Sequence, residues 1–300
     1  LLLFYLLCIL RINSSEGLYF LLNLTFYLLI ILGIASSNQK ILTESLYVFS
    51  LIILAIIFLH YCITTSSPYK FIFNNPNSLA LFLFFCMFQV IYSSRFLVVK
   101  LIAVWLVLFL VIQTGSRGTL LGICAFVFFM VFPKTMELIK PRYFFLGLIT
   151  MVIIICIMYA FSKGTNMGDL INTYSKLYFE KNLYSGRQEI WFSIIESMTG
   201  HVKIFGHGTG SGVGDIVGAD LSAHNSFFQI FFQTGLFGLM LVIIFLYKSV
   251  PINLSLKQDK IKVAFLSAII LPASAEVFIF QNHPVISMLL MIVLALDARK

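Results

Sequence analysis

Long apolar runs alternate with short polar stretches along most of this chain. The apolar runs form about ten segments, which lie at 1–10, 18–35, 44–63, 77–93, 97–114, 118–132, 143–160, 227–247, 263–280 and 284–296. A helix of about 20 apolar residues crosses the hydrocarbon core of a bilayer, and in lipid its backbone groups must pair within the helix. The pattern therefore predicts an all-α, polytopic transmembrane helical bundle. Segment 1–10 is short for a span, so we expect it to be the end of an N-terminally truncated helix.

One long polar interruption divides this pattern. We predict transmembrane helices over 1–160, with about seven segments, and over 227–300, with about three. Residues 161–226 between them are predicted to form a single large loop that carries an amphipathic helix.

The stretch YSGRQEIWFSIIESM (184–198) predicts that amphipathic helix. Ile190, Trp191 and Ile194 recur on one face at helical spacing. Ser185 and Gln188 have the spacing of a capping box, with Ser185 as N-cap and the Gln188 side chain reaching back to it.

Composition excludes a soluble globular domain, because 60% of the residues are hydrophobic and only 11% are charged. The chain has 20 Lys and Arg against 12 Asp and Glu, but the basic residues are spread over short loops. They therefore indicate topology and not nucleic-acid binding. The five cysteines lie in apolar runs without the spacing of a metal site.

Lysine and arginine in the short loops predict the orientation of the bundle, because positive loops stay on the cytoplasmic side. One side carries most of them: Lys40, Arg95, Lys100, Lys134, Lys140, Arg142, Lys248, Lys257, Lys260, Lys262, Arg299 and Lys300. The other side carries Arg11, Lys70 and Arg117. This distribution predicts that loop 161–226 lies outside the membrane, on the periplasmic or extracellular face.

Two arginines have the surroundings of an anion site. Arg187 would lie beside the unpaired N–H groups at the start of the predicted helix, where the helix dipole also favours an anion. Arg117 lies in QTGSRGTLLG (113–122), where two apolar runs meet with no room for a solvated loop. The ordinary alternatives are that Arg187 pairs with Glu189 or a lipid headgroup, and that Arg117 extends to lipid headgroups.

His224 is a candidate base. It precedes Asn225 just before the chain returns to an apolar run, and Asn225 could orient its ring. An ordinary histidine, with a pKa of about 6.5, is largely neutral at neutral pH and can accept a proton. His201 and His207 in the same loop are competing candidates, and a polar anchor at the membrane interface is the ordinary alternative.

Ionisable residues border the predicted spans instead of occupying their middles. Glu276 and His283 lie at the outer ends of late spans and could line an acceptor side of the site. Ion-coupled transporters need acidic or histidine residues near the midplane, so this distribution disfavours them. The glycines between 206 and 214 lack the Gly-Lys-Ser/Thr ending of a phosphate loop and favour a turn.

Taken together, five short motifs resemble the O-antigen ligase and O-antigen polymerase superfamily of bacterial membrane glycosyltransferases. They occur in the family's order around one large outer loop: NPNSLA (75–80), GSRGTLLG (115–122), SGRQEIW (185–191), FGHGTGSG (205–212) and AHNSFFQIFFQTGLFGL (223–239).

The resemblance implies a GT-C-like helical fold and transfer of a glycan from undecaprenyl diphosphate to an acceptor sugar at the periplasmic face. It implies no metal and no other cofactor. By the same resemblance, Arg117 and Arg187 bind the diphosphate and His224 is the catalytic base. The implied partners are the undecaprenyl-diphosphate-linked donor, a glycan or lipid A-core acceptor, and membrane lipid.

Alternatives remain open at this point. Within the family, a polymerase that joins repeat units is slightly favoured over a ligase that joins finished chains to lipid A core. From other classes, a lipid-linked oligosaccharide flippase or a non-enzymatic membrane scaffold would also fit an apolar bundle.

Overall fold

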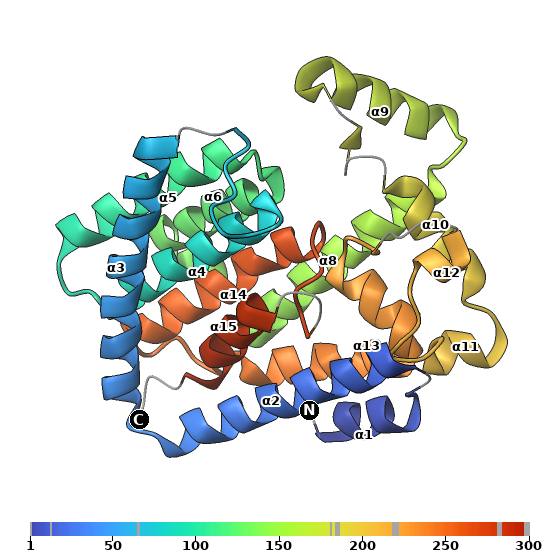
Figure 1. Cartoon of the computed structure of the whole chain (residues 1–300), viewed down its shortest axis with the longest axis horizontal. Helices are drawn as coiled ribbons and strands as arrows, with labels where there is room; N and C mark the ends of the chain where they lie inside the picture. The colour runs from blue at the N-terminus through green and yellow to red at the C-terminus, as the bar shows by residue number, and fades with distance from the viewer. Residues whose placement is uncertain are drawn as a thin grey trace. The chain divides into compact units, whose positions relative to one another are not determined.

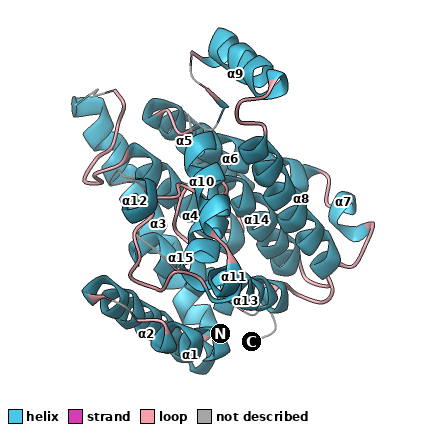
Figure 2. Ribbon diagram, turned by 90° about the vertical axis from the view of Figure 1, so that its right-hand side faces the viewer, coloured by secondary structure: helices cyan, strands magenta, loops and turns pink. Residues whose placement is uncertain are grey.

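The structure is a computed structural model that describes residues 2–12, 14–64, 67–180, 182–183, 187–217, 222–280 and 284–296. Within these ranges every regular element is an α-helix (Figures 1 and 2). In chain order they are α1 (Leu2–Leu10), α2 (Ser15–Ser36), α3 (Gln39–Thr64), α4 (Pro76–Ser93), α5 (Leu97–Thr114), α6 (Arg117–Val131), α7 (Lys134–Glu137), α8 (Pro141–Phe161), α9 (Asn166–Phe179), α10 (Gln188–Ser197), α11 (Gly200–Phe205), α12 (Gly214–Val217), α13 (Ser226–Ser249), α14 (Lys257–Ala273) and α15 (Pro284–Ala295). The predicted all-α class is confirmed.

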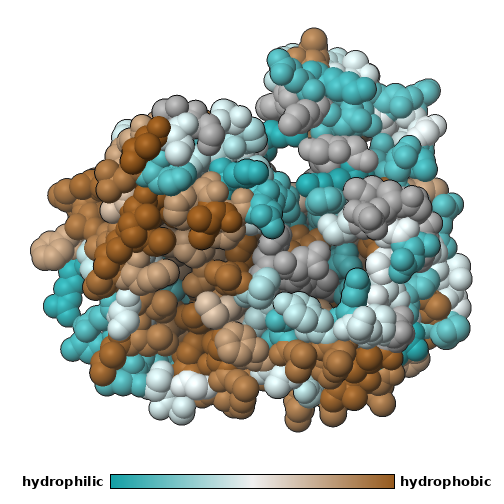
Figure 3. All heavy atoms as spheres, viewed as in Figure 1, coloured by the Kyte–Doolittle hydropathy of each residue, from teal (hydrophilic) through white to brown (hydrophobic). Residues whose placement is uncertain are grey.

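In the described part of the chain, six helices are long and apolar enough to cross a membrane: α2, α3, α4, α5, α8 and α13. The shorter helices α6 and α15 are also apolar. The expected count of ten segments is therefore not confirmed. Large apolar side chains such as Leu32, Trp105 and Met158 are exposed on these helices, and Figure 3 shows apolar residues over much of the visible face. A helix that is apolar on its exposed side as well as its packed side is suited to lipid.

The predicted segment 263–280 is wrong in its second half. Helix α14 ends at Ala273, directly after Pro272 in its last turn, and residues 274–280 are not helical. Val277, Phe278 and Ile279 in this stretch are nonetheless buried. The apolar composition of this stretch therefore indicates burial and does not indicate a helix. A buried non-helical stretch is possible here because other groups of the protein form hydrogen bonds with its backbone.

The chain divides into two compact units, each of which is described by itself. The first contains Leu1–Phe26, Gly147–Phe245 and Ala273–Asn282, and the second contains Tyr27–Leu146, Leu246–Pro272 and His283–Lys300.

Helix α4 is the core helix of the second unit, and nearly all of its side chains are buried. Its phenylalanines Phe84, Phe85 and Phe88 surround Phe265 of α14 at ring-centroid distances of 4.9, 5.1 and 4.3 Å. Asn75 starts the helix, because its side chain accepts a hydrogen bond from the Asn77 N–H at 2.8 Å. Pro76 follows at the first helical position, where its missing N–H costs nothing.

In the first unit, α13 changes direction at Gly235, whose backbone is left-handed at φ 67°. A Cβ atom there would collide with the Ile204 carbonyl of α11, so only glycine allows this close approach. The glycine turn that follows α11 packs against α13 just before Gly235. The N–H groups of His207 and Gly208 donate to the carbonyls of Phe232 and Gln233 at 2.9 and 3.0 Å. These donors stabilise the turn and are not turned toward a phosphate.

Candidate functional site

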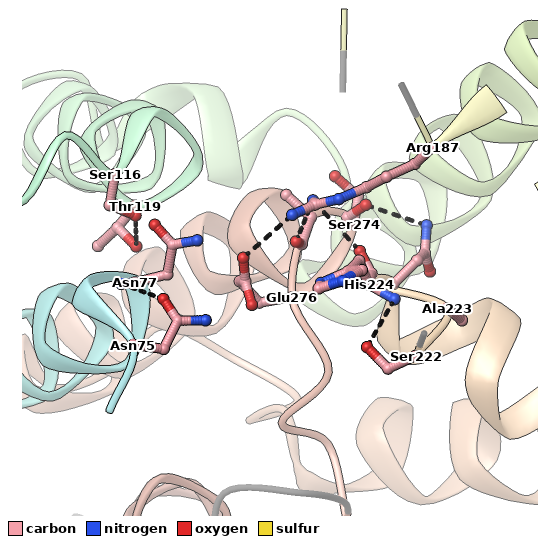
Figure 4. A network of polar contacts seen from close by, with 12 residues as sticks. Asn75, Asn77, Ser116, Thr119, Arg187, Ser222, Ala223, His224, Ser274 and Glu276 are labelled. Carbon is pink, nitrogen blue, oxygen red and sulfur yellow. Dashed lines mark hydrogen bonds and ion pairs between the residues drawn. The ribbon is translucent and has the colours of Figure 1, made fainter. Parts of the chain in front are cut away.

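Arg187 and His224 lie together in the first unit, with Glu276 as their common neighbour. Arg187 directly precedes α10, and its Nη2 lies 3.4 Å from Glu276 Oε1. Its Nη1 donates to the carbonyl oxygens of Ala275 and, at 3.5 Å, of His224 (Figure 4). The Arg187 and Glu276 side chains are only 14% and 8% exposed, so this ion pair is largely removed from water. Arg187 thus pairs with a carboxylate 89 residues away, whereas the ordinary alternative from sequence was Glu189.

Helix α10 holds Arg187 through its buried face. Trp191 is fully buried, stacks on Phe228 at 5.2 Å, and donates its indole N–H to the Ala223 carbonyl at 2.8 Å. Trp191 therefore joins α10 directly to the residue before His224. The predicted amphipathic pattern of this helix, with Ile190, Trp191 and Ile194 inside, is confirmed.

The Gln188 side chain is used differently from the predicted capping box. Its Nε2 donates to the Tyr159 carbonyl at 3.0 Å, in the last turn of α8, and to Ser162 Oγ at 2.7 Å, directly after α8. It also accepts a hydrogen bond from Asn172 of α9 at 3.2 Å. Gln188 thus ties the start of α10 to α8 and α9, while Ser185 lies outside the described residues.

His224 has a left-handed backbone, with φ 47°. Such a conformation is uncommon for a residue with a side chain and is enriched at functional sites. It is held by its neighbours: the His224 N–H donates to Ser222 Oγ at 3.3 Å, and the Ala223 N–H donates to Gln229 Oε1 at 3.0 Å. Burial, and then the positive charge of Arg187, lower the pKa of His224 from 6.5 to about 4. The imidazole is therefore neutral at neutral pH.

Asn225 holds the backbone that follows His224 and ties it to residue 274. Its Oδ1 accepts from the N–H groups of Phe227 and Phe228 at 2.9 and 3.1 Å and so caps α13. Its Nδ2 donates to the Ser274 carbonyl at 3.1 Å. Asn225 thus fixes the chain around His224 through the backbone.

Ser226 joins this turn to the non-helical stretch that carries Glu276. Its hydroxyl donates to the Glu276 carbonyl at 2.8 Å and accepts from the N–H groups of Phe278 and Ile279 at 3.1 and 3.3 Å. Sequence reasoning missed Ser226, although it stands in the AHNSFFQ motif beside the residues that were singled out. We call the contacts of Asn225 and Ser226 with residues 274–279 the clasp.

Removing the Ser226 hydroxyl should open the clasp. In Ser226→Ala, two buried N–H groups lose their acceptor, and each unsatisfied buried group costs about 1–3 kcal/mol. We expect a lower thermal unfolding temperature and weaker activity of the site. Ser36→Ala is the matched control, because Ser36 is exposed and bonds only within its own helix end. Equal unfolding temperatures for the two variants would contradict the role of Ser226.

Arg117 lies in the second unit and begins α6. Gly115 ends α5 in the left-handed conformation at φ 70°, and the Ser116 hydroxyl donates to Thr119 Oγ1 at 3.1 Å. The Arg117 side chain is exposed at a helix N-terminus, where unpaired N–H groups and the dipole favour an anion. The structure thus brings together Arg187, His224, Asn225 and Glu276 in the first unit. Arg117 belongs to the second unit. His283 lies outside the described residues.

An apolar cleft adjoins the histidine turn. Its volume is about 250 Å³, and it lies among side chains of α8, α10 and α13. Cys156, Ile157, Phe228 and Leu239 are among its lining residues. Asn225 also lines it, so one residue belongs both to the polar cluster and to the cleft wall.

The competing histidines have other surroundings. His207 stacks on Phe232 at 4.6 Å and lies 3.3 Å from Ser197 Oγ through its Nε2. Burial and the charge of Arg11 lower its pKa. His201 is exposed on α11.

Residues 102–243 match the family model described as O-antigen ligase. The matched range contains Arg117, Arg187 and His224 and ends before Glu276. No curated protein and no solved structure matches the chain.

Proposed function

Because residues 102–243 match the family model described as O-antigen ligase, we propose that the chain is an inverting membrane glycosyltransferase of the O-antigen ligase and polymerase superfamily. In this proposal it moves a glycan from undecaprenyl diphosphate to an acceptor sugar at the periplasmic face of a bacterial inner membrane. The observation that carries the proposal is the buried contact of Arg187 with Glu276 and with the backbone of His224. This contact supports one site for an anion and a base, built from three separate parts of the chain.

His224 acts as the general base. A neutral imidazole has a free lone pair and can remove the proton of an acceptor hydroxyl as that hydroxyl attacks. The depressed pKa of His224 keeps the ring in this form throughout the neutral range. The neighbouring Arg187 charge also opposes a lasting positive charge on the ring, so the proton is passed on after transfer.

Arg187 binds the diphosphate and stabilises its departure. A guanidinium has five N–H donors in a planar fork that matches phosphate oxygens, so Arg187 has the chemistry to bind a phosphate in bidentate fashion. A diphosphate competes with Glu276 for the Nη2 side of Arg187, while the Ala275 and His224 carbonyls continue to orient the group. In this proposal Arg117, at its exposed helix N-terminus, is a further anion-binding residue.

The reaction conserves atoms and charge in one displacement. The acceptor oxygen forms a bond to the anomeric carbon as its proton moves to His224 Nε2 or Nδ1. The bond from the anomeric carbon to the diphosphate oxygen breaks, and its electron pair leaves with the diphosphate. Charge that develops on that oxygen is stabilised by Arg187, a contribution typically worth a few kcal/mol for each donor. Attack from the opposite face inverts the anomeric configuration.

The apolar cleft supports a lipid-linked donor. It adjoins Asn225 and is lined by aliphatic and aromatic side chains, which suit an isoprenoid chain and not a sugar. Its place beside the clasp would set the lipid next to the diphosphate group that it carries.

Reconstitution tests the proposal directly. The full chain is placed in vesicles with an undecaprenyl-diphosphate-linked repeat unit, and the products are separated by length. Longer undecaprenyl-linked glycans indicate a polymerase, and transfer only when lipid A core is added indicates a ligase. Movement of the donor across the bilayer without any new glycosidic bond would instead favour the flippase. If neither glycan transfer nor donor movement is observed, the non-enzymatic scaffold is favoured.

The pH dependence of transfer should report His224. Its folded pKa lies below the ordinary value of 6.5, so the base is available above about pH 4 and is lost as the pH falls through that value. We expect kcat/KM to stay flat from pH 8 to about pH 5 and to fall near pH 4. The same shift means that stability from the buried neutral ring is lost as the pH falls from 6.5 toward 4. Unfolding is therefore followed in parallel, and a loss of activity centred near pH 6.5 would contradict the assignment.

A further inference from the structure

Helix α9 has an unusual distribution of side chains, in which small and polar residues face the protein. Asn172 accepts a hydrogen bond from the Tyr159 hydroxyl at 3.0 Å and donates to Gln188 at 3.2 Å. Gly168 packs so closely on the Ser162 carbonyl that a Cβ atom would collide with it. Ser175, one to two turns along on the same side, is buried. Hydrogen bonds and the close approach of small residues, and not apolar side chains, therefore hold this side of α9 against the protein.

The apolar residues of α9 lie on its exposed side. They are Met167, Leu170, Tyr174, Leu177 and Tyr178, which are 52–72% exposed. At about 100° per residue these five positions share one face of the helix. In both ribbon views α9 stands out from the other helices of its unit (Figures 1 and 2). We call this surface the apolar face of α9.

A third side of α9 is suited to water. Asp169, Thr173 and Lys176 are exposed and lie between the apolar face and the protein-facing side. A helix in water would be expected to place such residues over its whole exposed surface. Here the exposed surface is divided into an apolar half and a polar half, as in helices that lie in a membrane interface.

The position of α9 in the chain identifies the occupant of its apolar face. Helix α8, a candidate span, ends at Phe161, and α9 begins at Asn166 after only four intervening residues. Contacts of Asn172 and Gly168 with Tyr159 and Ser162 hold α9 against the end of that span. The apolar face is thus fixed at the level where a span leaves the bilayer.

We propose that α9 lies in the interface of the membrane, with its apolar face in the phospholipid acyl chains and Asp169, Thr173 and Lys176 in water. Tyr174 and Tyr178 then occupy the zone where tyrosine is enriched, because the ring is apolar and the hydroxyl reaches the headgroups. Lys176 can approach the phosphate of a headgroup from the water side. The anchoring does not depend on the transfer reaction. It links lipid to the active site through Asn172, because Asn172 bonds Gln188, the residue next to Arg187.

Photocrosslinking of the full chain tests the proposal. Benzoylphenylalanine is introduced at Tyr174 in one protein and at Lys176 in a second. These exposed positions are two residues apart and therefore about 200° apart around the helix. A third protein carries the probe at Leu177, on the apolar face again. Each protein is reconstituted in nanodiscs of phosphatidylethanolamine and phosphatidylglycerol without any polyprenyl lipid and is then irradiated. Mass spectrometry identifies the crosslinked adducts and measures their yield.

We expect phospholipid adducts at Tyr174 and Leu177 at least about tenfold more often than at Lys176. Equal yields at Tyr174 and Lys176 would overturn the proposal. So would crosslinks from Tyr174 and Leu177 to another part of the chain or to a second copy, since these would show that protein covers the apolar face. Adducts that form only after undecaprenyl-linked donor is added would also overturn it, and would assign the face to the donor lipid.

Discussion

Replacing His224 with asparagine is expected to lower the rate of glycan transfer by about 10²- to 10⁴-fold, which is the usual contribution of a general base. Asparagine is chosen because it tolerates the left-handed backbone found at this position, where φ is 47°. Its amide cannot accept the proton of the acceptor hydroxyl. The rate is measured on the reconstituted protein, with donor and acceptor both at saturating concentrations.

The control for this variant is His207→Asn. His207 lies in the glycine turn and stacks on Phe232, and the proposal gives it no role in transfer. If His207→Asn loses activity and His224→Asn retains it, the base is misassigned. An unchanged unfolding temperature in His224→Asn separates lost chemistry from lost structure.

The second large effect is expected at Arg187. Arg187→Ala removes the proposed diphosphate contact and should reduce transfer by about 10²- to 10³-fold. It should also destabilise the fold, because the buried Glu276 carboxylate loses the guanidinium charge that compensates it. Breaking a buried pair in this way typically costs about 3–5 kcal/mol.

A double variant separates the two consequences of losing Arg187. In Arg187→Ala with Glu276→Gln, neither charge is buried, so much of the lost stability should return while transfer stays low. Lys260→Ala serves as the control for the loss of an ion pair, because Lys260 and Glu137 are 37% and 42% exposed and such pairs contribute about 0–1 kcal/mol. Normal transfer by the double variant would rule out Arg187 as the diphosphate site.

The helices and the amphipathic pattern of α10 were predictable because they depend on local sequence. The spacing of Ile190, Trp191 and Ile194 already specifies which side of α10 is buried. Asn75 and Pro76 likewise mark the start of α4 by the chemistry of their own side chains. Each of these features is determined within a few residues along the chain.

The stretch after α14 was predicted wrongly because buried loops and apolar helices have the same composition. Residues 274–280 are held by Ser226 and Asn225, which lie about 50 residues earlier in the chain. The only local signals were Pro272, in the last turn of α14, and the polar Ser274 and Glu276 that follow. Hydropathy averaged over a window hides such isolated residues.

The arginine and histidine of the candidate site could be singled out from sequence, but their electrostatic state could not. The pair between Arg187 and Glu276 joins residues 89 apart, and no local pattern encodes it. The pKa of His224 also depends on how deeply the turn is buried and on its distance from Arg187. Such properties exist only once the chain is packed.

The clasp has a consequence for the order in which the protein matures. A ribosome that has made residues 1–245 has already produced Arg187, His224 and Ser226, but not the segment that Ser226 binds. The Glu276 carboxylate and the Ala275 carbonyl are synthesised later, after α14. Until then Arg187 lacks its counter-charge and the start of α13 lacks its clasp partner. Assembly of the site is thus a late event of biosynthesis, and nascent chains in the membrane pass through a stage in which the reactive residues are present but not yet aligned.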